Sequence, residues 1–373
     1  MIRAVALSPV PYEGAGCRFR IAQYIPHLRS QGVDLTIEPF YTPEFFRLVY
    51  RPGHHAQKAR LFCRQALSRV WMCLRRPRPD LVLIYREALP LGPPLVELAL
   101  SAMRVPLVYD FDDAVFLENT SDANRYLASL KWPQKTGSII ARCDQVIAGN
   151  EYLAAFARQH NSAVHVIPTS IDVTTFVPRT TPAAPGATPV IGWIGTPTTA
   201  GYLASLTAAL QGLPPRSFVF RVCGATSDME LSGVTVENRP WTLEREVELF
   251  NTCDVGVYPL PDDAWAQGKC GFKAIQFMAC AVPVVASPVG VNRDIIQDGV
   301  NGFLASTPGE WTRKLGALLA DPDLRRRLGA AGRRTIEARF SLQVNAPRVA
   351  EVIRHAAARV GATALAHASG DQR

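Results

Sequence analysis

The sequence lacks closely spaced cysteine pairs and histidine clusters, which excludes the simplest metal and disulfide sites. Its 373 residues include eight cysteines, none at Cys-x2-Cys spacing, and seven scattered histidines. Zinc modules and small disulfide-rich domains place their cysteines in close, regular pairs. We therefore expect a reducing environment in which the cysteines are buried as small apolar side chains.

Long apolar runs are also missing. The most apolar stretch, residues 81–103, contains Arg86, Glu87 and Glu97, whereas a membrane-spanning helix needs about 20 mostly apolar residues. Prolines at positions 9 and 11 interrupt the first residues too early for a secretory signal. The expected location is the cytoplasm, and peripheral attachment to the inner membrane face is an open alternative.

The overall composition is that of a folded, globular protein. Hydrophobic residues make up 48% of the chain and charged residues 19%, and disordered chains have a much lower apolar content. The length is sufficient for two domains, each with its own core.

Short apolar runs alternate with amphipathic stretches in both halves of the chain. This alternation predicts α/β domains with parallel sheets covered on both faces. The expected strands of the first half are Ala4–Leu7, Asp34–Pro39, Leu81–Tyr85, Leu107–Tyr109, Gln145–Ala148 and Ala163–Ile167. Those of the second half are Val190–Ile194, Phe218–Cys223, Val234–Glu237, Val255–Tyr258 and Val282–Ala286.

A stretch rich in Thr, Pro and Ala separates the two halves and is typical of a linker. We predict a first domain over residues 1–172, a linker over 173–189, a second domain over 190–344 and a C-terminal helix and tail over 345–373. Doubly wound sheets of this kind bind ligands beyond the carboxyl ends of their strands.

Acidic residues are absent from residues 47–78, which carry nine Lys and Arg. Trp71 and several leucines lie among these cations. A cationic helix with apolar residues suits an anionic membrane surface, although a helix packed on the sheet would show a similar pattern. No motif for nucleic acid accompanies the charge.

A glycine-containing loop leads into an expected helix at residue 272. Gly271 precedes Phe272, Lys269 lies in the loop, and Lys273 and Gln276 are three residues apart on one helix face. The first turn of a helix offers free N–H groups and a positive dipole end, which favour an anion. The arrangement predicts a site for a pyrophosphate and its ribose, although lysines of a solvated helix would look similar.

The residues that follow strengthen this interpretation. The segments 277–281 (FMACA) and 283–287 (PVVAS), together with Gly290, Asp298-Gly299 and 302–304 (GFL), resemble the C-terminal signature of glycosyltransferase family 4. The resemblance implies a GT-B fold, in which two doubly wound Rossmann-like domains face a cleft. It also implies a nucleoside diphosphate sugar as donor.

The sequence departs from this family at two glutamates. The Glu-x7-Glu positions of the family fall at Gly268 and Gln276 here, and Lys269 and Lys273 stand close to them. The resulting Lys-x3-Lys-x2-Gln pattern is similar to a variant of the family. Gln276 keeps the capacity to hydrogen-bond a ribose but carries no charge.

Further donor-binding residues are implied by the same resemblance. Gly195 and Thr196 follow the first strand of the second domain, where a phosphate could approach the backbone. Trp241 could stack on the base or be a core residue. In the first domain Gly16 lies in the loop after the first strand, and we expect at least one of Arg18 and Arg20 to reach an anion, with a solvated helix start as the alternative.

The segment 109–116 (YDFDDAVF) is the most polar cluster after a first-domain strand. The family has a histidine here, and the resemblance suggests that Asp110 or Asp112 takes its place, orienting an acceptor hydroxyl or stabilising the transition state. Arg86 could be a charged partner of these residues. Paired aspartates could also hold a divalent cation, or Asp112 and Asp113 could cap a helix; no metal is expected, because family members resemble one another in not needing one.

The function that we expect is glycosyl transfer from a nucleoside diphosphate sugar to a glycan or lipid-linked acceptor, with retention of configuration. The nucleotide sugar is a co-substrate, and no cofactor is expected. Two alternatives are a GT-B nucleotide-sugar epimerase and a non-catalytic nucleotide-sugar-binding protein.

Overall fold

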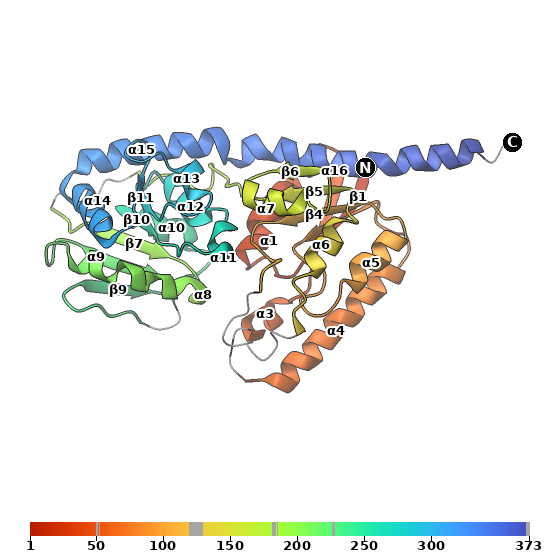
Figure 1. The fold of residues 1–373 in the computed structure, drawn as a ribbon, viewed down its shortest axis with the longest axis horizontal. Coiled ribbons are helices and arrows are strands. Elements are labelled where there is room, and N and C mark those ends of the chain that lie inside the picture. Colours follow the sequence, from red (N-terminus) through yellow and green to blue (C-terminus); the bar gives the residue numbers. More distant parts are fainter. Residues whose placement is uncertain are drawn as a thin grey trace. The chain divides into compact units, whose positions relative to one another are not determined.

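The computed structural model describes residues 1–49, 51, 53–118, 130–180, 184, 186–225 and 228–370, without side chains for 359–370. The chain forms two compact units, Met1–Ser170 with Asn345–Arg373, and Ile171–Val344. Figure 1 shows that each unit contains its own sheet with helices around it. This is the two-domain α/β fold that the sequence predicts.

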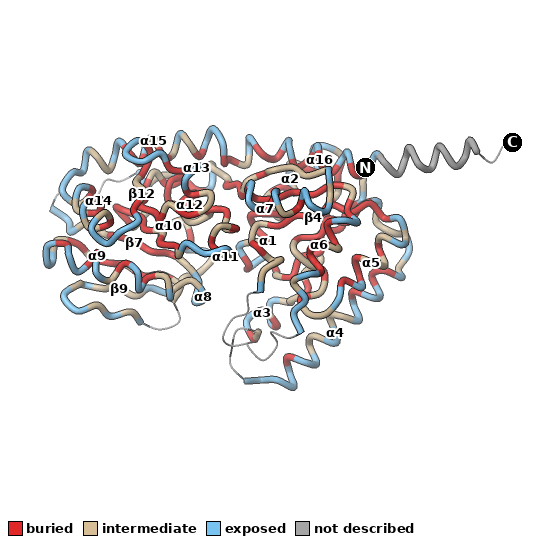
Figure 2. The backbone as a smooth tube through the Cα atoms, in the orientation of Figure 1, coloured by how far each residue is buried: buried red, intermediate tan, exposed pale blue. Residues whose placement is uncertain are grey.

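The first unit is built on a six-stranded parallel sheet in the order β2-β1-β3-β4-β5-β6. All residues of the inner strands β3 and β4 are buried, as expected for a parallel sheet covered on both faces (Figure 2). The strands are β1 (Ile2–Ser8), β2 (Val33–Pro39), β3 (Leu81–Tyr85), β4 (Leu107–Phe111), β5 (Gln145–Ala148) and β6 (Val164–Val166).

Short helices connect these strands, with one longer exception. The helical segment between β1 and β2 consists of three pieces, α1 (Ala15–Arg20), a 3-10 turn (Ala22–Tyr24) and α2 (Ile25–Ser30). Pro26 lies in the first turn of α2, where proline is tolerated. The other helices are α3 (Pro43–Val49), α4 (His55–Leu74), α5 (Leu95–Ala102), α6 (Lys135–Ile140) and α7 (Glu151–Ala157).

The C-terminal helix α16 (Leu342–Gly370) begins at the end of the second unit and packs on the first. Its Arg348 donates to the Val166 carbonyl over 2.6 Å, and Arg354 donates to Gln31 over 3.4 Å. Buried residues such as Val349, Ile353 and Ala356 recur at helical spacing and form the packed face. The C-terminal segment thus completes the N-terminal unit.

The second unit has a parallel sheet in the order β12-β11-β10-β7-β8-β9. The strands are β7 (Val190–Ile194), β8 (Val219–Cys223), β9 (Thr235–Arg239), β10 (Val255–Tyr258), β11 (Val284–Ala286) and β12 (Phe303–Leu304). Five of these match the predicted strands within two residues. β12 was not expected, because two residues carry no alternating pattern.

The helices of the second unit cover this sheet, and several of them begin with a recognisable cap. Thr307 and Glu310 form a capping box at the start of α14. The helices are α8 (Pro197–Ala200), a 3-10 helix (Gly201–Leu206), α9 (Thr207–Gln211), α10 (Glu246–Asn251), α11 (Ala264–Gln267), α12 (Phe272–Ala279), α13 (Asn292–Ile295), α14 (Pro308–Ala320) and α15 (Pro322–Arg339).

The predicted linker over 173–189 starts inside the second unit. Phe176 is buried and its ring meets that of Phe250 at a centroid distance of 6.1 Å. Arg179 donates to Asp254 over 2.7 Å, and the same carboxylate accepts from the Val190 N–H. Arg333 and Asn251 add to these contacts by donating to the Val173 carbonyl over 2.7 Å and the Val177 carbonyl over 2.9 Å. Residues 181–183 and 185 lie outside the described part of the chain.

Among the residues that the structure describes, no helix combines the length and the apolar character needed to cross a membrane.

Candidate functional site

Predicted donor-binding residues of the second unit lie at the carboxyl edge of its sheet. Of the predicted residues, Thr196 follows β7 and Trp241 follows β9. Gly224 and Ser287, which were not predicted, follow β8 and β11 at the same edge. All of these strands are parallel, so their carboxyl ends share one edge. This edge is where ligands of doubly wound sheets bind.

Two glycines bring the backbones of β7 and β8 close together at that edge. A Cβ on Gly224 would lie 2.4 Å from the Gly195 carbonyl oxygen, and one on Gly195 would lie 2.2 Å from the Trp193 ring. Trp241 packs against the same place, with its Cβ 3.4 Å from that built at Gly224. Thr196 is exposed and forms a capping box with Thr199 at the start of α8.

Helix α12 begins at a residue that has to be glycine. Gly271 is its N-cap with φ 65° and ψ 19°, in the left-handed region. A Cβ there would lie 2.3 Å from Ile295 Cδ1 and 3.2 Å from Asn292 Oδ1. The turn therefore packs tightly against α13 while the first turn of α12 begins at Phe272, whose side chain is half-buried.

Three polar side chains form a chain of hydrogen bonds beside this helix start. Lys273 Nζ donates to Gln276 Oε1 over 2.8 Å, and Gln276 Nε2 donates to Glu246 Oε1 over 3.3 Å. Gln276 is fully buried and Glu246 is 5% exposed. Glu246, on α10, thus places a carboxylate next to the position where the family has its second glutamate.

The two lysines are oriented by aromatic rings as well. The Lys273 ammonium lies 5.6 Å from the Phe250 ring centroid and 5.9 Å from that of Phe272. The Lys269 ammonium lies 5.8 Å from the Trp265 ring of α11. Ring faces attract cations, so both charges are held at the segment that leads into α12.

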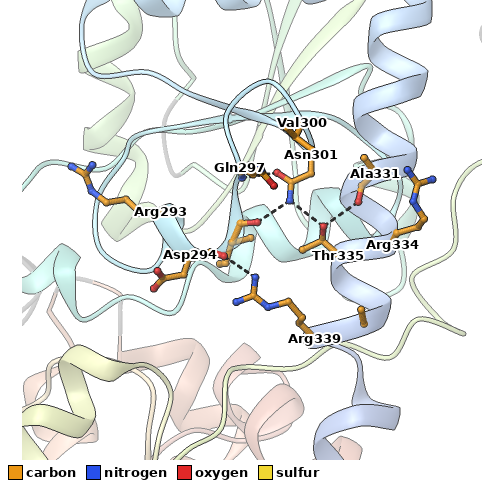
Figure 3. Close-up of a pocket in the computed structure, with 11 residues that line it drawn as sticks. Arg293, Asp294, Gln297, Val300, Asn301, Ala331, Arg334, Thr335 and Arg339 are labelled. Atoms are coloured by element: carbon orange, nitrogen blue, oxygen red, sulfur yellow. Dashed lines mark hydrogen bonds between the residues drawn. The ribbon is translucent and has the colours of Figure 1, made fainter.

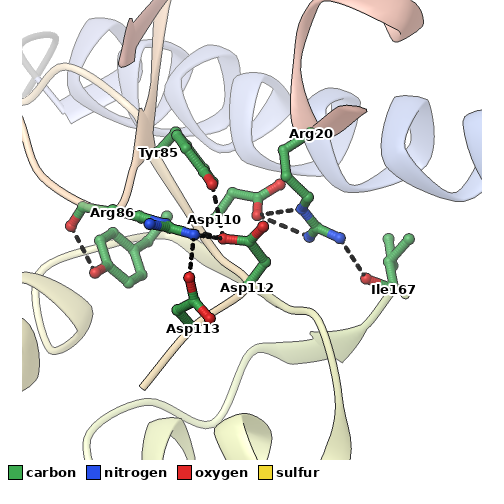
Figure 4. Close-up of polar contacts among 8 residues, drawn as sticks. Arg20, Tyr85, Arg86, Asp110, Asp112, Asp113 and Ile167 are labelled. Carbon is green, nitrogen blue, oxygen red and sulfur yellow. Dashed lines mark hydrogen bonds and ion pairs between the residues drawn. The ribbon is translucent and has the colours of Figure 1, made fainter. Parts of the chain in front are cut away.

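The first unit has a polar cluster at the carboxyl ends of β3 and β4 (Figure 4). Arg86 donates to Asp112 over 2.9 and 2.6 Å and to Asp113 over 2.5 Å. The Tyr85 hydroxyl donates to the same Asp112 oxygen over 2.7 Å. The expected partnership between Arg86 and the aspartates is present, and residues 112–118 are turns rather than a helix.

Asp110 lies deeper and is paired with Arg20. Arg20 donates to Asp110 Oδ1 through Nε over 2.9 Å and through Nη2 over 2.7 Å. Its third contact is the Ile167 carbonyl at 2.9 Å, and the two side chains are only 1% and 3% exposed. Arg20 therefore joins α1, β4 and the segment after β6 inside the unit.

The two aspartates have pKa values shifted in opposite directions. Burial raises the pKa of Asp110 to about 6, against the opposing attraction of Arg20. Burial also acts to raise the pKa of Asp112, but the charges of Arg86 and Arg20 and the bonds from Tyr85 and Arg86 outweigh it, so that pKa is lowered. Carboxyls with diverging pKa values often have different roles in acid–base chemistry.

Gly16 and Arg18 lie in α1, next to this cluster. A Cβ on Gly16 would lie 2.1 Å from the Tyr85 hydroxyl, so glycine is required for that hydroxyl to reach Asp112. Arg18 is 6% exposed, donates to the Glu13 carbonyl over 2.9 Å and lies over the Phe19 ring. The structure thus brings Gly16, Asp110, Asp112 and Arg20 together within one unit.

A cavity of about 510 Å³ lies elsewhere in the second unit, between α13 and α15 (Figure 3). Its wall contains Arg293, Arg334 and Arg339 but none of the residues predicted to bind the donor. Asn301 donates to the Ile295 carbonyl and to Thr335 in its wall, and Arg339 donates to the Asp294 carbonyl. These contacts brace the turn before β12 against α15.

Comparison with known proteins places this chain in a family. The model of glycosyltransferase family 4 matches residues 19–175, and that of the group 1 glycosyl transferases matches residues 188–321. The chain is a family 4-like glycosyltransferase. It is therefore an enzyme, as the resemblance of its C-terminal signature implied.

Curated relatives have the same activity class. The chain is 28% identical over 300 residues to a D-inositol 3-phosphate glycosyltransferase of Xylanimonas cellulosilytica, covering 70% of this chain and 69% of that protein. The D-inositol 3-phosphate glycosyltransferase of Thermobispora bispora is 34% identical over 116 residues, covering 31% of this chain and 26% of that protein.

Solved structures share the GT-B fold. A glycosyltransferase from Rickettsia africae superposes with a TM-score of 0.69 at 15% identity, covering 95% of this chain and 98% of that one. Anabaena HepE, solved in complex with UDP-glucose, superposes with a TM-score of 0.67 at 18% identity, covering 95% of this chain and all of that one. The predicted fold class is thereby confirmed.

Two contributors to the site were not predicted from the sequence. Glu246 lies 30 residues before Gln276, and only folding brings α10 beside α12. Tyr85 ends an otherwise apolar strand, and the sequence does not indicate that its hydroxyl donates to Asp112. A polar group at a strand's carboxyl end was the one signal available for Tyr85.

Proposed function

We propose that this enzyme transfers a sugar, with retention of configuration, from a nucleoside diphosphate sugar to a lipid-linked or polysaccharide acceptor at the cytoplasmic membrane face. The observation that carries the donor assignment is the Lys273–Gln276–Glu246 chain of hydrogen bonds at the start of α12. It combines the N-terminus and a cation of α12 with a carboxylate of α10.

Each of these groups fits one part of a nucleoside diphosphate. The first turn of α12 and the ammonium groups of Lys269 and Lys273 would bind the pyrophosphate. The Glu246 carboxylate would accept hydrogen bonds from the ribose hydroxyls, and the Gln276 amide would donate to them or accept from them. Trp241, at the end of β9, would lie near the base.

The chemistry that follows is stabilisation of the leaving group. As the glycosidic bond breaks, negative charge accumulates on the diphosphate, and fixed cations and N–H dipoles lower the energy of that state. In the first unit, Asp110 accepts hydrogen bonds from Arg20, and Asp112 and Asp113 accept them from Arg86. We propose that Asp112, kept ionised by Arg86, orients the acceptor hydroxyl, and that the reaction needs neither a metal nor a cofactor.

Donor binding and turnover are tested separately. Calorimetric titration with UDP, GDP and ADP identifies the nucleotide, and the corresponding sugars are then incubated with lipid and glycan acceptors. NMR of the product shows whether the anomeric configuration of the donor is kept. An inverted product would overturn retention, and loss of activity in EDTA with recovery in Mn²⁺ would overturn the metal-free mechanism.

The same incubations decide between this function and its alternative. Release of a free epimerised sugar without an acceptor would mean that the enzyme is a nucleotide-sugar epimerase.

Asp112→Asn should lower turnover at least tenfold while the donor Kd stays within about twofold, because Asp112 is proposed to act on the acceptor.

A further inference from the structure

Helix α4 (His55–Leu74) of the first unit reverses the usual pattern of a surface helix, with cations on its buried face and apolar residues on its exposed face. Its inner face buries Lys58, Arg69, Met72 and Cys73. Arg69 donates to the Glu38 carbonyl over 2.7 Å and to the Ala88 carbonyl over 3.3 Å. The buried cations of this helix, Lys58 and Arg69, thus point inward and donate hydrogen bonds to backbone carbonyls.

The outer face carries an apolar stripe. Leu67, Val70, Trp71 and Leu74 are 69, 54, 66 and 69% exposed. Their spacing of i, i+3, i+4 and i+7 places them on one side of the helix. Figure 2 shows exposed segments along α4. Single exposed apolar residues are ordinary, but four on one stripe mark an interaction surface.

Cations lie on the same outer face and beyond its end. Arg60 and Arg64 are exposed and precede Leu67 by seven and three residues, which is the spacing of one helix face. Arg76 follows the helix and is exposed as well. Arg69, on the inner face, and Arg75, directly after the helix, are instead paired with Glu38. The cations of residues 47–78 therefore divide into an inward set and an outward set.

We propose that the outer face of α4 docks on an anionic lipid surface. Leu67, Trp71 and Leu74 enter the interfacial region, and Arg60, Arg64 and Arg76 bind lipid phosphates. An anionic partner matches this face, because residues 47–78 carry nine basic residues and no acid of their own, and Arg60, Arg64 and Arg76 are exposed. A fluid bilayer accepts the convex side of a helix, which offers no groove to a folded partner, and an interfacial Trp suits the headgroup boundary.

This inference goes beyond the proposed glycosyl transfer and does not depend on it. The docking residues lie on a different unit from Lys273 and Gln276, so vesicle binding and donor binding can be measured independently. A protein that binds nucleoside diphosphate but not vesicles would refute the docking proposal and the proposed membrane location, and would leave the donor assignment standing.

The chain provides its own reporter for the experiment. Cys63 lies on the outer face between Arg60 and Arg64, and it is exposed whereas the other seven cysteines are buried. An environment-sensitive fluorophore attached to the Cys63 thiol of the full chain should shift to the blue on vesicles containing phosphatidylglycerol. Pure phosphatidylcholine vesicles should produce a much weaker response.

Two sets of variants test the two parts of the surface, with flotation of unlabelled protein as readout. Arg60→Gln with Arg64→Gln should weaken binding roughly 10- to 30-fold, since each basic residue near an anionic surface contributes about fivefold. Trp71→Ser with Leu74→Ser should weaken it at least tenfold. The matched control is Arg313→Gln with Arg327→Gln, two exposed arginines of the second unit with the same loss of charge.

Several results would overturn the proposal. If both sets of variants float with the vesicles as well as the wild type does, the lipid contact lies elsewhere. The same follows if the control variant loses as much vesicle binding as the α4 variants. Equal binding to neutral vesicles, unaffected by salt, would remove the role of charge. A wild-type dimer that Trp71→Ser converts to a monomer, without vesicle binding, would show that the stripe is an interface between copies of this chain.

Discussion

Gln276 donates a hydrogen bond to the carboxylate of Glu246, two residues from different helices that are 30 positions apart. The family's second glutamate position is occupied by an amide here, and a carboxylate from α10 lies beside it. We infer that the negative charge has moved from α12 to α10 without leaving the site. Lys273, bonded to the same amide, completes a neutral group of three side chains.

Glu246→Gln tests this exchange directly. A charge-assisted hydrogen bond to a ribose hydroxyl is worth roughly 1.5–3 kcal/mol, so the Kd should rise about 10- to 150-fold. The loss should be similar for the nucleoside and the nucleoside diphosphate, because both carry the ribose. Glutamine keeps an acceptor for Gln276, so the fold should be retained. Unchanged nucleoside affinity in calorimetry would show that Glu246 does not contact the ribose.

Lys273→Ala should act on the phosphates instead. Loss of a lysine–phosphate contact costs roughly 1.5–3 kcal/mol, which corresponds to diphosphate binding about 10- to 150-fold weaker. Nucleoside binding should hardly change. Lys269→Ala should give a similar but smaller effect. The Lys269 ammonium lies over the Trp265 ring of α11, on the other side of the loop from the start of α12.

The matched control for both lysine variants is Arg313→Gln, which removes one exposed charge from the second unit. It should leave the affinity for the diphosphate as it is in the wild type. If wild type, Lys273→Ala and Lys269→Ala bind diphosphate equally, the pyrophosphate lies elsewhere and the assignment to the start of α12 fails.

Gly271→Ala should destabilise the second unit. Alanine at φ 65° costs about 1–2 kcal/mol, and its Cβ would lie 2.3 Å from Ile295 Cδ1. A total near 2–3 kcal/mol predicts a Tm about 4–10 °C lower. Gly201→Ala is the control, since Gly201 has φ −58° and nothing within 4 Å of its Cβ position. Equal Tm values for the two variants would contradict the argument.

The sequence predicted the sheets well because their strands are short apolar runs between turns. β3, β5, β7 and β10 begin and end where expected. The loop and helix around Gly271 followed from residue types at fixed spacing, and the Lys273–Gln276 contact follows from helix geometry. What could not be predicted depends on contacts between distant segments, such as Glu246 beside Gln276.

Arg20 shows the same limit in the first unit. Its position after a glycine-containing loop suggested an anion ligand, but its guanidinium is buried against Asp110 and the Ile167 carbonyl. No local pattern distinguishes an arginine that binds a ligand from one that binds a buried carboxylate 90 positions away. Likewise, the sequence alone did not show that Arg69 of α4 and Arg75, which follows it, pair with Glu38.

The buried pair Arg20–Asp110 makes a prediction about stability and pH. The pKa of Asp110 is raised from 3.8 to about 6 because burial outweighs the attraction of Arg20. Between these values the folded state binds more protons than the unfolded state at this carboxyl. The free energy of unfolding contributed by Asp110 therefore falls as the pH rises, and stops changing above about pH 7.

Asp110→Asn isolates this contribution, because asparagine does not titrate while all other groups are shared. Asparagine still accepts a hydrogen bond from Arg20, so the variant should fold, although with a weaker contact. From pH 5 to pH 7.5 the wild type should lose roughly 1–2 kcal/mol of unfolding free energy relative to the variant. Denaturant unfolding of both proteins at the two pH values measures the difference. A wild type that instead gains stability over the variant across this range would mean that Arg20 dominates and that the pKa of Asp110 is lowered.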